Sequence, residues 1–132
     1  MEKYITKEEY RAAKGVDLDL ELKNNDDPTN KAERFIKEWT DWCAEHLIAN
    51  YRAYILWEWP DEGDPTNPLL TEERQRLFRE GCIEQMDYIL STGDIARASG
   101  VNQDMGVVMN LESAQLSRKA AAKFRLAGFM NI

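Results

Sequence analysis

Cys43 and His46 are the two side chains whose types and spacing come closest to a catalytic pair. A cysteine nucleophile needs a general base within reach, and His46 is the chain's single histidine. Three residues apart on a helix, the two side chains lie on neighbouring parts of its surface. No nucleophile elbow or oxyanion-hole motif accompanies them. We therefore expect ordinary helix packing and a protein that is not an enzyme, with an enzyme built on this pair as an open alternative.

Metal and cofactor sites have little support in the sequence. Cys43 and Cys82 lack CxxC spacing and lie in helix-like apolar patterns, so we predict two reduced core thiols. Carboxylates bind Mg²⁺ or act as acid and base only where several converge in a pocket. Here they lie in loops, with two acidic stretches within 17–27 and 58–64, and on the polar faces of helices, which favours a solvated acidic surface. The glycine motifs that bind phosphate groups are absent too, so we expect no metal and no cofactor.

The charge of the chain is acidic and uneven. A formal net charge of −7 disfavours binding to a phosphate backbone, because such binding depends on Lys and Arg. The segment after Glu112 has the opposite sign and contains no acidic side chain. One subunit therefore has complementary ends. The basic residues of this segment are Arg118, Lys119, Lys123 and Arg125.

The length of 132 residues predicts one domain, 1–132. We expect it to be mainly α, a small helical bundle with a long central helix and a short β-hairpin or extended loop. No apolar run approaches the ~20 residues that a membrane span needs. The first residues also lack the apolar region of a signal peptide, so we expect synthesis in the cytosol and no membrane.

Capping residues set the bounds of the first expected helix. Thr6 and Glu9 fit a capping box, in which each side chain bonds to the backbone of the other residue. Gly15 is suited to the left-handed position after a helix that ends near residue 14. Apolar and acidic residues then alternate over 16–22, and we interpret this stretch as an extended arm in preference to an edge strand.

Two longer helices should form the core. Asp27, followed by a proline, predicts the start of a helix over 28–53. Thr71 predicts the cap of a second helix over 71–91, which Gly93 ends. Apolar residues recur at helical spacing in both. We expect them to pack against each other through Phe35, Ile36, Trp39, Cys43, Leu47, Leu77, Cys82, Met86 and Ile89.

The rest of the chain combines a glycine-rich stretch with a short basic helix. Residues 94–110 are suited to the β-hairpin or ordered loop. Ser117 caps a final helix over 118–127, and Gly128 ends it before the apolar tail 129–132. A helix this short is marginal alone, so it needs a partner surface. That partner is either the core of this chain or an acidic neighbour.

Trp57 and Trp59 open a proline-rich acidic stretch, 57–68, that we expect to be an exposed loop. In an extended segment the two rings would point the same way. Either the helices of this chain or a neighbouring subunit covers them, and tryptophan is enriched at interface hot spots. The predicted protein-contact residues are Trp57, Trp59, Arg118, Lys119, Lys123, Arg125, Phe129, Met130 and Ile132.

The order of these elements resembles a known family. The segments that carry the resemblance are an opening Ile-Thr-Lys-Glu-Glu-Tyr at 5–10, an acidic Asn-Asp-Asp-Pro-Thr at 25–29 before Glu-Arg-Phe-Ile at 33–36, and a closing Leu-Ser at 116–117 with Ala120 to Phe129. Together they resemble the head-tail connector (adaptor) proteins of long-tailed double-stranded DNA phages and prophages, over nearly the whole chain. The longer, more aromatic stretch 57–68 departs from that pattern.

The resemblance implies a structural virion protein without chemistry of its own. It implies a ring, commonly of twelve subunits, between the portal protein and the tail-side completion protein. DNA would pass through its channel without sequence-specific binding. The expected location is the head-tail interface of the virion, with host cytoplasm during assembly. The alternative is an acidic DNA mimic or another small interaction protein, although a mimic should spread its carboxylates along one entire face.

Overall fold

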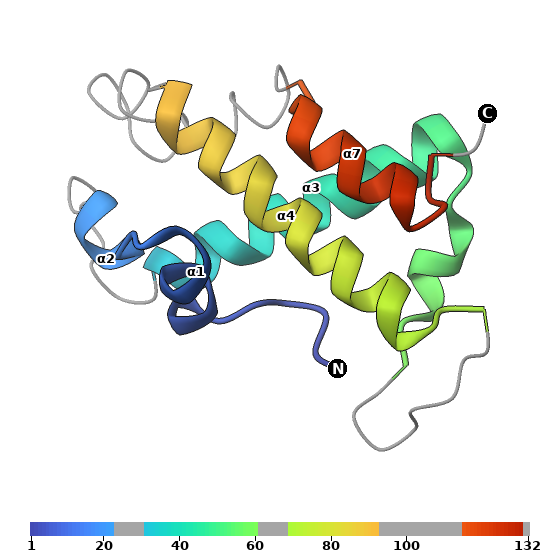
Figure 1. The fold of residues 1–132 in the computed structure, drawn as a ribbon, viewed down its shortest axis with the longest axis horizontal. Helices are drawn as coiled ribbons and strands as arrows, with labels where there is room; N and C mark the ends of the chain where they lie inside the picture. Colours follow the sequence, from blue (N-terminus) through green and yellow to red (C-terminus); the bar gives the residue numbers. More distant parts are fainter. Residues whose placement is uncertain (23–30, 61–68, 93–114, 131–132) are drawn as a thin grey trace.

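The computed structural model describes residues 1–22, 31–60, 69–92 and 115–130, and these are mainly helical (Figure 1). This confirms the predicted fold class. The predicted hairpin or loop at 94–110 lies outside the described residues. In chain order the elements are α1 (Lys7–Lys14), α2 (Leu18–Glu21), α3 (Lys31–Tyr51), the 3-10 helix η1 (Tyr54–Glu58), α4 (Glu72–Thr92) and α7 (Arg118–Leu126).

The two long helices α3 and α4 cross, and the short helices lie around them (Figure 1). α7 packs mainly on α4, on the right in the view, whereas α1 and α2 lie toward the left end. Each of α1, α3 and α7 therefore has α4 as a neighbour. The arrangement makes α4 the helix that joins the N-terminal and C-terminal parts of the fold.

The first helix has the bounds that its capping residues predict. The Thr6 hydroxyl accepts from the Glu9 backbone N–H at 3.0 Å, and the Glu9 carboxylate accepts from the Thr6 N–H at 3.1 Å. Gly15 follows at φ 70°, a left-handed conformation that glycine adopts without steric cost. The predicted capping box and terminating glycine are both confirmed.

The predicted extended arm at 16–22 is wrong, because this stretch contains the one-turn helix α2. Asp17 caps it by accepting from the backbone N–H of Asp19 at 3.0 Å. In the helical turn Leu18 is buried and Leu22 packs against the core four residues later, while Leu20 points outward and is 66% exposed. The alternation of apolar and acidic residues favoured an extended segment, but the local aspartate cap decided the conformation.

The two long helices agree with the prediction within a few residues. α3 ends at Tyr51 because Arg52 takes a left-handed conformation at φ 56°. The predicted first turn at 28–30 lies outside the described residues. Thr71 caps α4 by accepting from the Arg74 N–H at 3.2 Å, as predicted. All the residues predicted to pack between these helices are buried.

The core continues from α4 into α7 through aromatic side chains. Phe78 lies 5.7 Å from Phe124 and 6.1 Å from Phe129, centroid to centroid, and all three rings are buried. Gly81 lies directly beneath Phe124, since a Cβ added there would come within 2.3 Å of the ring. The absence of a side chain at this point of α4 lets α7 approach closely.

α7 begins and ends as predicted. The Ser117 hydroxyl accepts from the Ala120 N–H at 3.0 Å, and Gly128 has φ 82°. The side-chain amide of Gln85 on α4 accepts from the Ser117 N–H at 2.8 Å and donates to the Gln115 carbonyl at 3.0 Å. This buried amide satisfies backbone groups at the start of α7 and fixes it against α4.

Candidate interaction surfaces

Cys43 and His46 do not form a nucleophile and base pair in the structure. The Cys43 thiol is buried, and its pKa is raised by burial first and by the neighbouring Cys82 thiol of α4 second. His46 stacks on Trp42 with centroids 4.9 Å apart, and burial lowers its pKa. No hydrogen bond joins these two side chains in the part of the chain that the structure describes. Both cysteines are free and buried, as predicted.

Within 1–22, 31–60, 69–92 and 115–130, no group of three His, Cys, Asp or Glu side chains is placed to hold a metal ion. No helix in these same ranges is both long enough and apolar enough to cross a membrane.

The structure separates the two tryptophans that the sequence placed together. Trp57 belongs to η1, so the first two residues of the predicted loop 57–68 are helical, and its side chain is 71% exposed. Residues 61–68 of that predicted loop lie outside the described residues. Trp57 stacks on Tyr54, itself 52% exposed, with ring centroids 5.3 Å apart. Trp59 instead packs 5.5 Å from Phe78 and donates its Nε1–H to the Met1 carbonyl at 2.9 Å. The expectation that both rings point the same way is wrong, because the 3-10 turn rotates Trp57 outward.

α7 presents an exposed basic face, which we name the basic stripe. It consists of Arg118, Lys119, Arg125 and Leu126. The three cations make no ion pair within the described residues, and Leu126 beside them is 73% exposed. At spacings of one and seven residues, these side chains lie on one side of the helix, opposite buried Phe124. The sequence predicted the cations of this face, but not the leucine.

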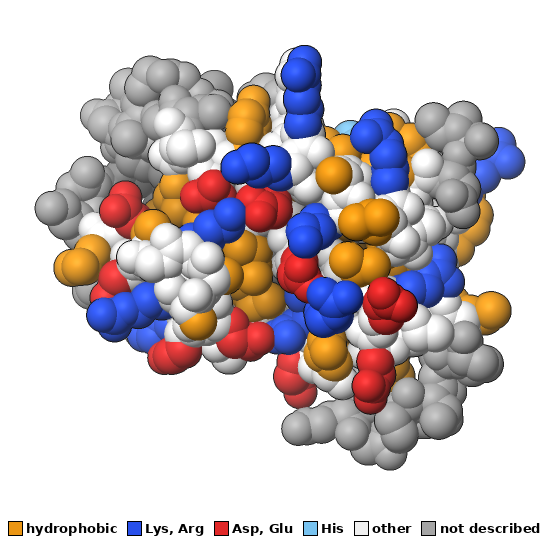
Figure 2. Space-filling model, in the orientation of Figure 1, with side chains coloured by type: hydrophobic (Ala, Val, Ile, Leu, Met, Phe, Trp, Pro, Cys, Tyr) orange, Lys and Arg blue, Asp and Glu red, His pale blue; other side chains and the backbone are white. Residues whose placement is uncertain are grey.

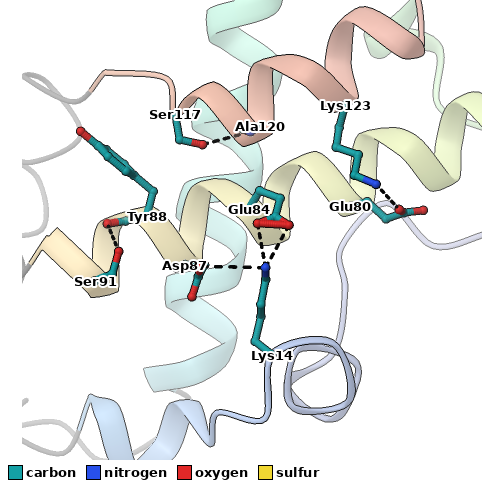
Figure 3. A network of polar contacts seen from close by, with 9 residues as sticks. All are labelled: Lys14, Glu80, Glu84, Asp87, Tyr88, Ser91, Ser117, Ala120 and Lys123. Atoms are coloured by element: carbon teal, nitrogen blue, oxygen red, sulfur yellow. Dashed lines mark hydrogen bonds and ion pairs between the residues drawn. The ribbon is translucent and has the colours of Figure 1, made fainter.

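Three other predicted contact residues have different surroundings. Lys123 reaches from α7 to Glu80 on α4, Nζ to Oε1 at 2.9 Å (Figure 3). Phe129 and Met130 are buried in the core of this chain, and the Arg74 guanidinium lies over the Phe129 ring. The structure thus corrects the prediction that these apolar side chains face a partner. Ile132 lies outside the described residues.

Arg74 holds the C-terminal turn against the start of α4. Its Nε donates to the Ala127 carbonyl at 2.7 Å, and its guanidinium also donates to the Leu69 carbonyl. The Phe129 N–H donates to the Phe124 carbonyl at 2.9 Å, which closes the turn after α7. Arg74 had no predicted role, since two of its partners, Ala127 and Phe129, lie more than fifty residues away in the chain.

An acidic surface lies at the other end of the molecule, and we name it the acidic end. It consists of Glu8, Asp19, Leu20, Glu21 and Glu33. Lys7 lies among its carboxylates and pairs with Asp19 at 2.9 Å, and this contact and the charges of Glu33 and Glu8 raise the lysine pKa. One cation thus faces three carboxylates. The sequence indicated the acidic stretch that begins at Asp17, but only the fold adds Glu8 and Glu33.

Comparisons with protein-family models, with curated proteins and with solved structures find no match to this chain.

Proposed function

We propose that this chain is a structural subunit that works by protein contact, as a head-tail connector of a long-tailed phage or prophage. In this function it forms a ring between the portal protein and the tail-side completion protein, and DNA passes through the ring. The order of helices and capping motifs supports the assignment, because it is the feature that resembles the connector family. We propose with it that the ring lies at the head-tail interface of the virion and binds these two proteins there.

The observation that carries a contact function is the exposed aromatic pair on η1. Tyr54 and Trp57 stack on each other, yet most of the Trp57 ring remains in water. Exposed apolar area of this size is costly in an isolated subunit, and tryptophan and tyrosine dominate the energetics of protein interfaces. Two residues separate η1 from the end of α3, and Leu56 of η1 is buried, so the pair lies on a helical turn that is anchored in the core.

The basic stripe weighs against the alternative of a DNA mimic. A mimic needs carboxylates in continuous phosphate-like rows, because it competes for a surface that binds a phosphate backbone. The exposed side of α7 carries Arg118, Lys119 and Arg125 and no acidic side chain. An adaptor with faces of both signs fits this charge distribution better.

The proposal is tested by deleting the gene from a phage or prophage that carries it and imaging the induced particles by electron microscopy. We expect DNA-filled heads and separate tails, and tailed particles again when the wild-type gene is supplied in trans. Supplying Trp57→Ala should lower the tailed fraction at least several-fold, since it removes an interface anchor. Glu45→Ala, another exposed position, is the control and should restore tailing. Normal tailed particles from the deletion itself would refute the connector function.

A further inference from the structure

Two of the three cations of the basic stripe are placed where they do not favour helix α7 itself. Arg118 and Lys119 occupy the first turn, which contains no acidic side chain. Cations there oppose the positive end of the helix dipole and cost about 0.3–1 kcal/mol each. Leu126 adds exposed apolar area at the other end of the same face. A surface that combines these features gains stability only when an acidic, partly apolar surface covers it.

The acidic end has the complementary composition. Asp19 and Glu21 flank Leu20 on α2, and this leucine is 66% exposed. Glu8 on α1 and Glu33 on α3 lie near the same Lys7 and extend the negative surface. The acidic end therefore offers an excess of carboxylates over Lys7 near one exposed leucine, and the basic stripe offers three cations near another.

The two surfaces lie apart on one molecule. α2 lies at the left end in Figure 1, and α7 lies in the right half. In Figure 2 the upper edge over α7 carries Lys and Arg side chains, whereas on the left, around α2, acidic side chains lie together with Lys and Arg. Residues 115–132 contain four of the chain's 17 basic residues and no acidic residue. Residues 1–114 therefore contain the remaining 13 basic residues and all 24 acidic residues.

We infer that the basic stripe on α7 binds the acidic end of a second copy of this chain, head to tail. Because the two surfaces differ and lie apart, a pair of bound copies still has one unbound basic stripe and one unbound acidic end. Further copies can therefore bind in the same way, which gives a closed ring or an open chain. The inference deepens the proposed function, on which it rests for the ring. At ~0.1 M salt the Debye length is about 10 Å, so the local contact outweighs the repulsion between copies of charge −7.

A nucleic acid is a poorer occupant of the stripe than a protein surface. A phosphate backbone binds cations and hydrogen-bond donors, but its charged oxygens offer no apolar surface to cover an exposed leucine. The stripe also belongs to a molecule whose net charge repels polyanions. An acidic protein surface with its own exposed leucine satisfies both parts of the stripe.

The contact is tested by sedimentation equilibrium of the purified full chain at about 0.1 M salt, from roughly 0.05 to 1 mM. One variant combines Arg118→Gln with Lys119→Gln, which weakens the stripe. The other combines Glu21→Gln with Glu33→Gln, which weakens the acidic end. All four positions are exposed, so the folded monomer should be unchanged by circular dichroism.

We expect the wild-type average mass to rise above the 15.3 kDa monomer with concentration, and each variant alone to stay near the monomer. An equimolar mixture of the variants keeps one intact stripe and one intact acidic end. It should therefore form a 1:1 dimer and nothing larger. A wild-type chain that stays monomeric throughout, or a mixture no heavier than its separate components, would overturn the inference.

Two controls complete the experiment. The pair Glu45→Gln and Arg52→Gln lies outside both surfaces and should associate as the wild type does. Fluorescence anisotropy with a labelled DNA duplex tests the other occupant, and tight binding that the stripe variant abolishes would overturn the choice of a protein surface. The mass measurement needs no phage particle, so its failure is distinct from a failure of the connector function.

Discussion

Gly81→Ala tests the close approach of Phe124 on α7 to Gly81 on α4. In an isolated helix this change is stabilising by about 1 kcal/mol, because alanine has the higher helix propensity. In the folded chain the new methyl group would lie 2.3 Å from Cε1 of Phe124. Phe124 is buried and packs against Phe78, so its ring has no open space to move into. Overpacking of this kind costs about 3 kcal/mol at the upper end of its range, which leaves a net loss of about 2 kcal/mol.

The assay is urea denaturation followed by circular dichroism. For a chain of this size, a loss of about 2 kcal/mol lowers the midpoint by about 1 M urea, with an unchanged slope. Phe124→Ala alone should cost about 3–5 kcal/mol. In that background Gly81→Ala meets no ring, so its effect should reverse to a gain of about 1 kcal/mol. The cycle then gives a coupling near 3 kcal/mol, the upper end for residues in contact.

The sign of the single change is decisive. If Gly81→Ala raises the midpoint, only the helix propensity is acting, and α7 does not lie on α4 as described. If the change is destabilising by the same amount with and without Phe124, the clash is with another group. Either result would refute the close approach of α7 to Gly81.

Three further predictions concern the core, the tail and acid. Trp39→Ala should lower the free energy of unfolding by about 3–5 kcal/mol, because the side chain is fully buried, whereas Trp57→Ala should change it by less than about 1 kcal/mol. Deleting 128–132 should lower the thermal midpoint sharply, since it removes the buried side chains of Phe129 and Met130 from the core. An unchanged midpoint would indicate that the tail contacts a partner instead of this chain's core. Burial favours a raised pKa at Glu80, but hydrogen bonds from Lys123 and Arg76 outweigh burial and lower the pKa. The Glu80 carboxylate therefore stabilises the fold fully above about pH 4.5, and this stabilisation is lost as the pH falls further. The urea midpoints of wild type and Glu80→Gln should accordingly converge as the pH falls.

The sequence by itself determined the local features of this protein. The helix caps and terminating glycines act as predicted, because they depend on contacts within three or four residues. They are Thr6, Gly15, Thr71, Ser117 and Gly128. The same holds for the buried faces of α3 and α4, which follow from helical spacing. The cations of the basic stripe were also predicted, because the sign of charge along a segment needs no fold to be seen.

Tertiary structure decided which surfaces are left for a partner. Phe129 and Met130 had two predicted destinations, and only the packing of α7 on α4 placed them in the core. Trp57 and Trp59 look equivalent in sequence, yet only Trp59 reaches Phe78. Glu33 joins the acidic end only because α1, α2 and α3 meet there. Burial and surface charge depend on distant segments that come together, and spacing along the chain does not contain that information.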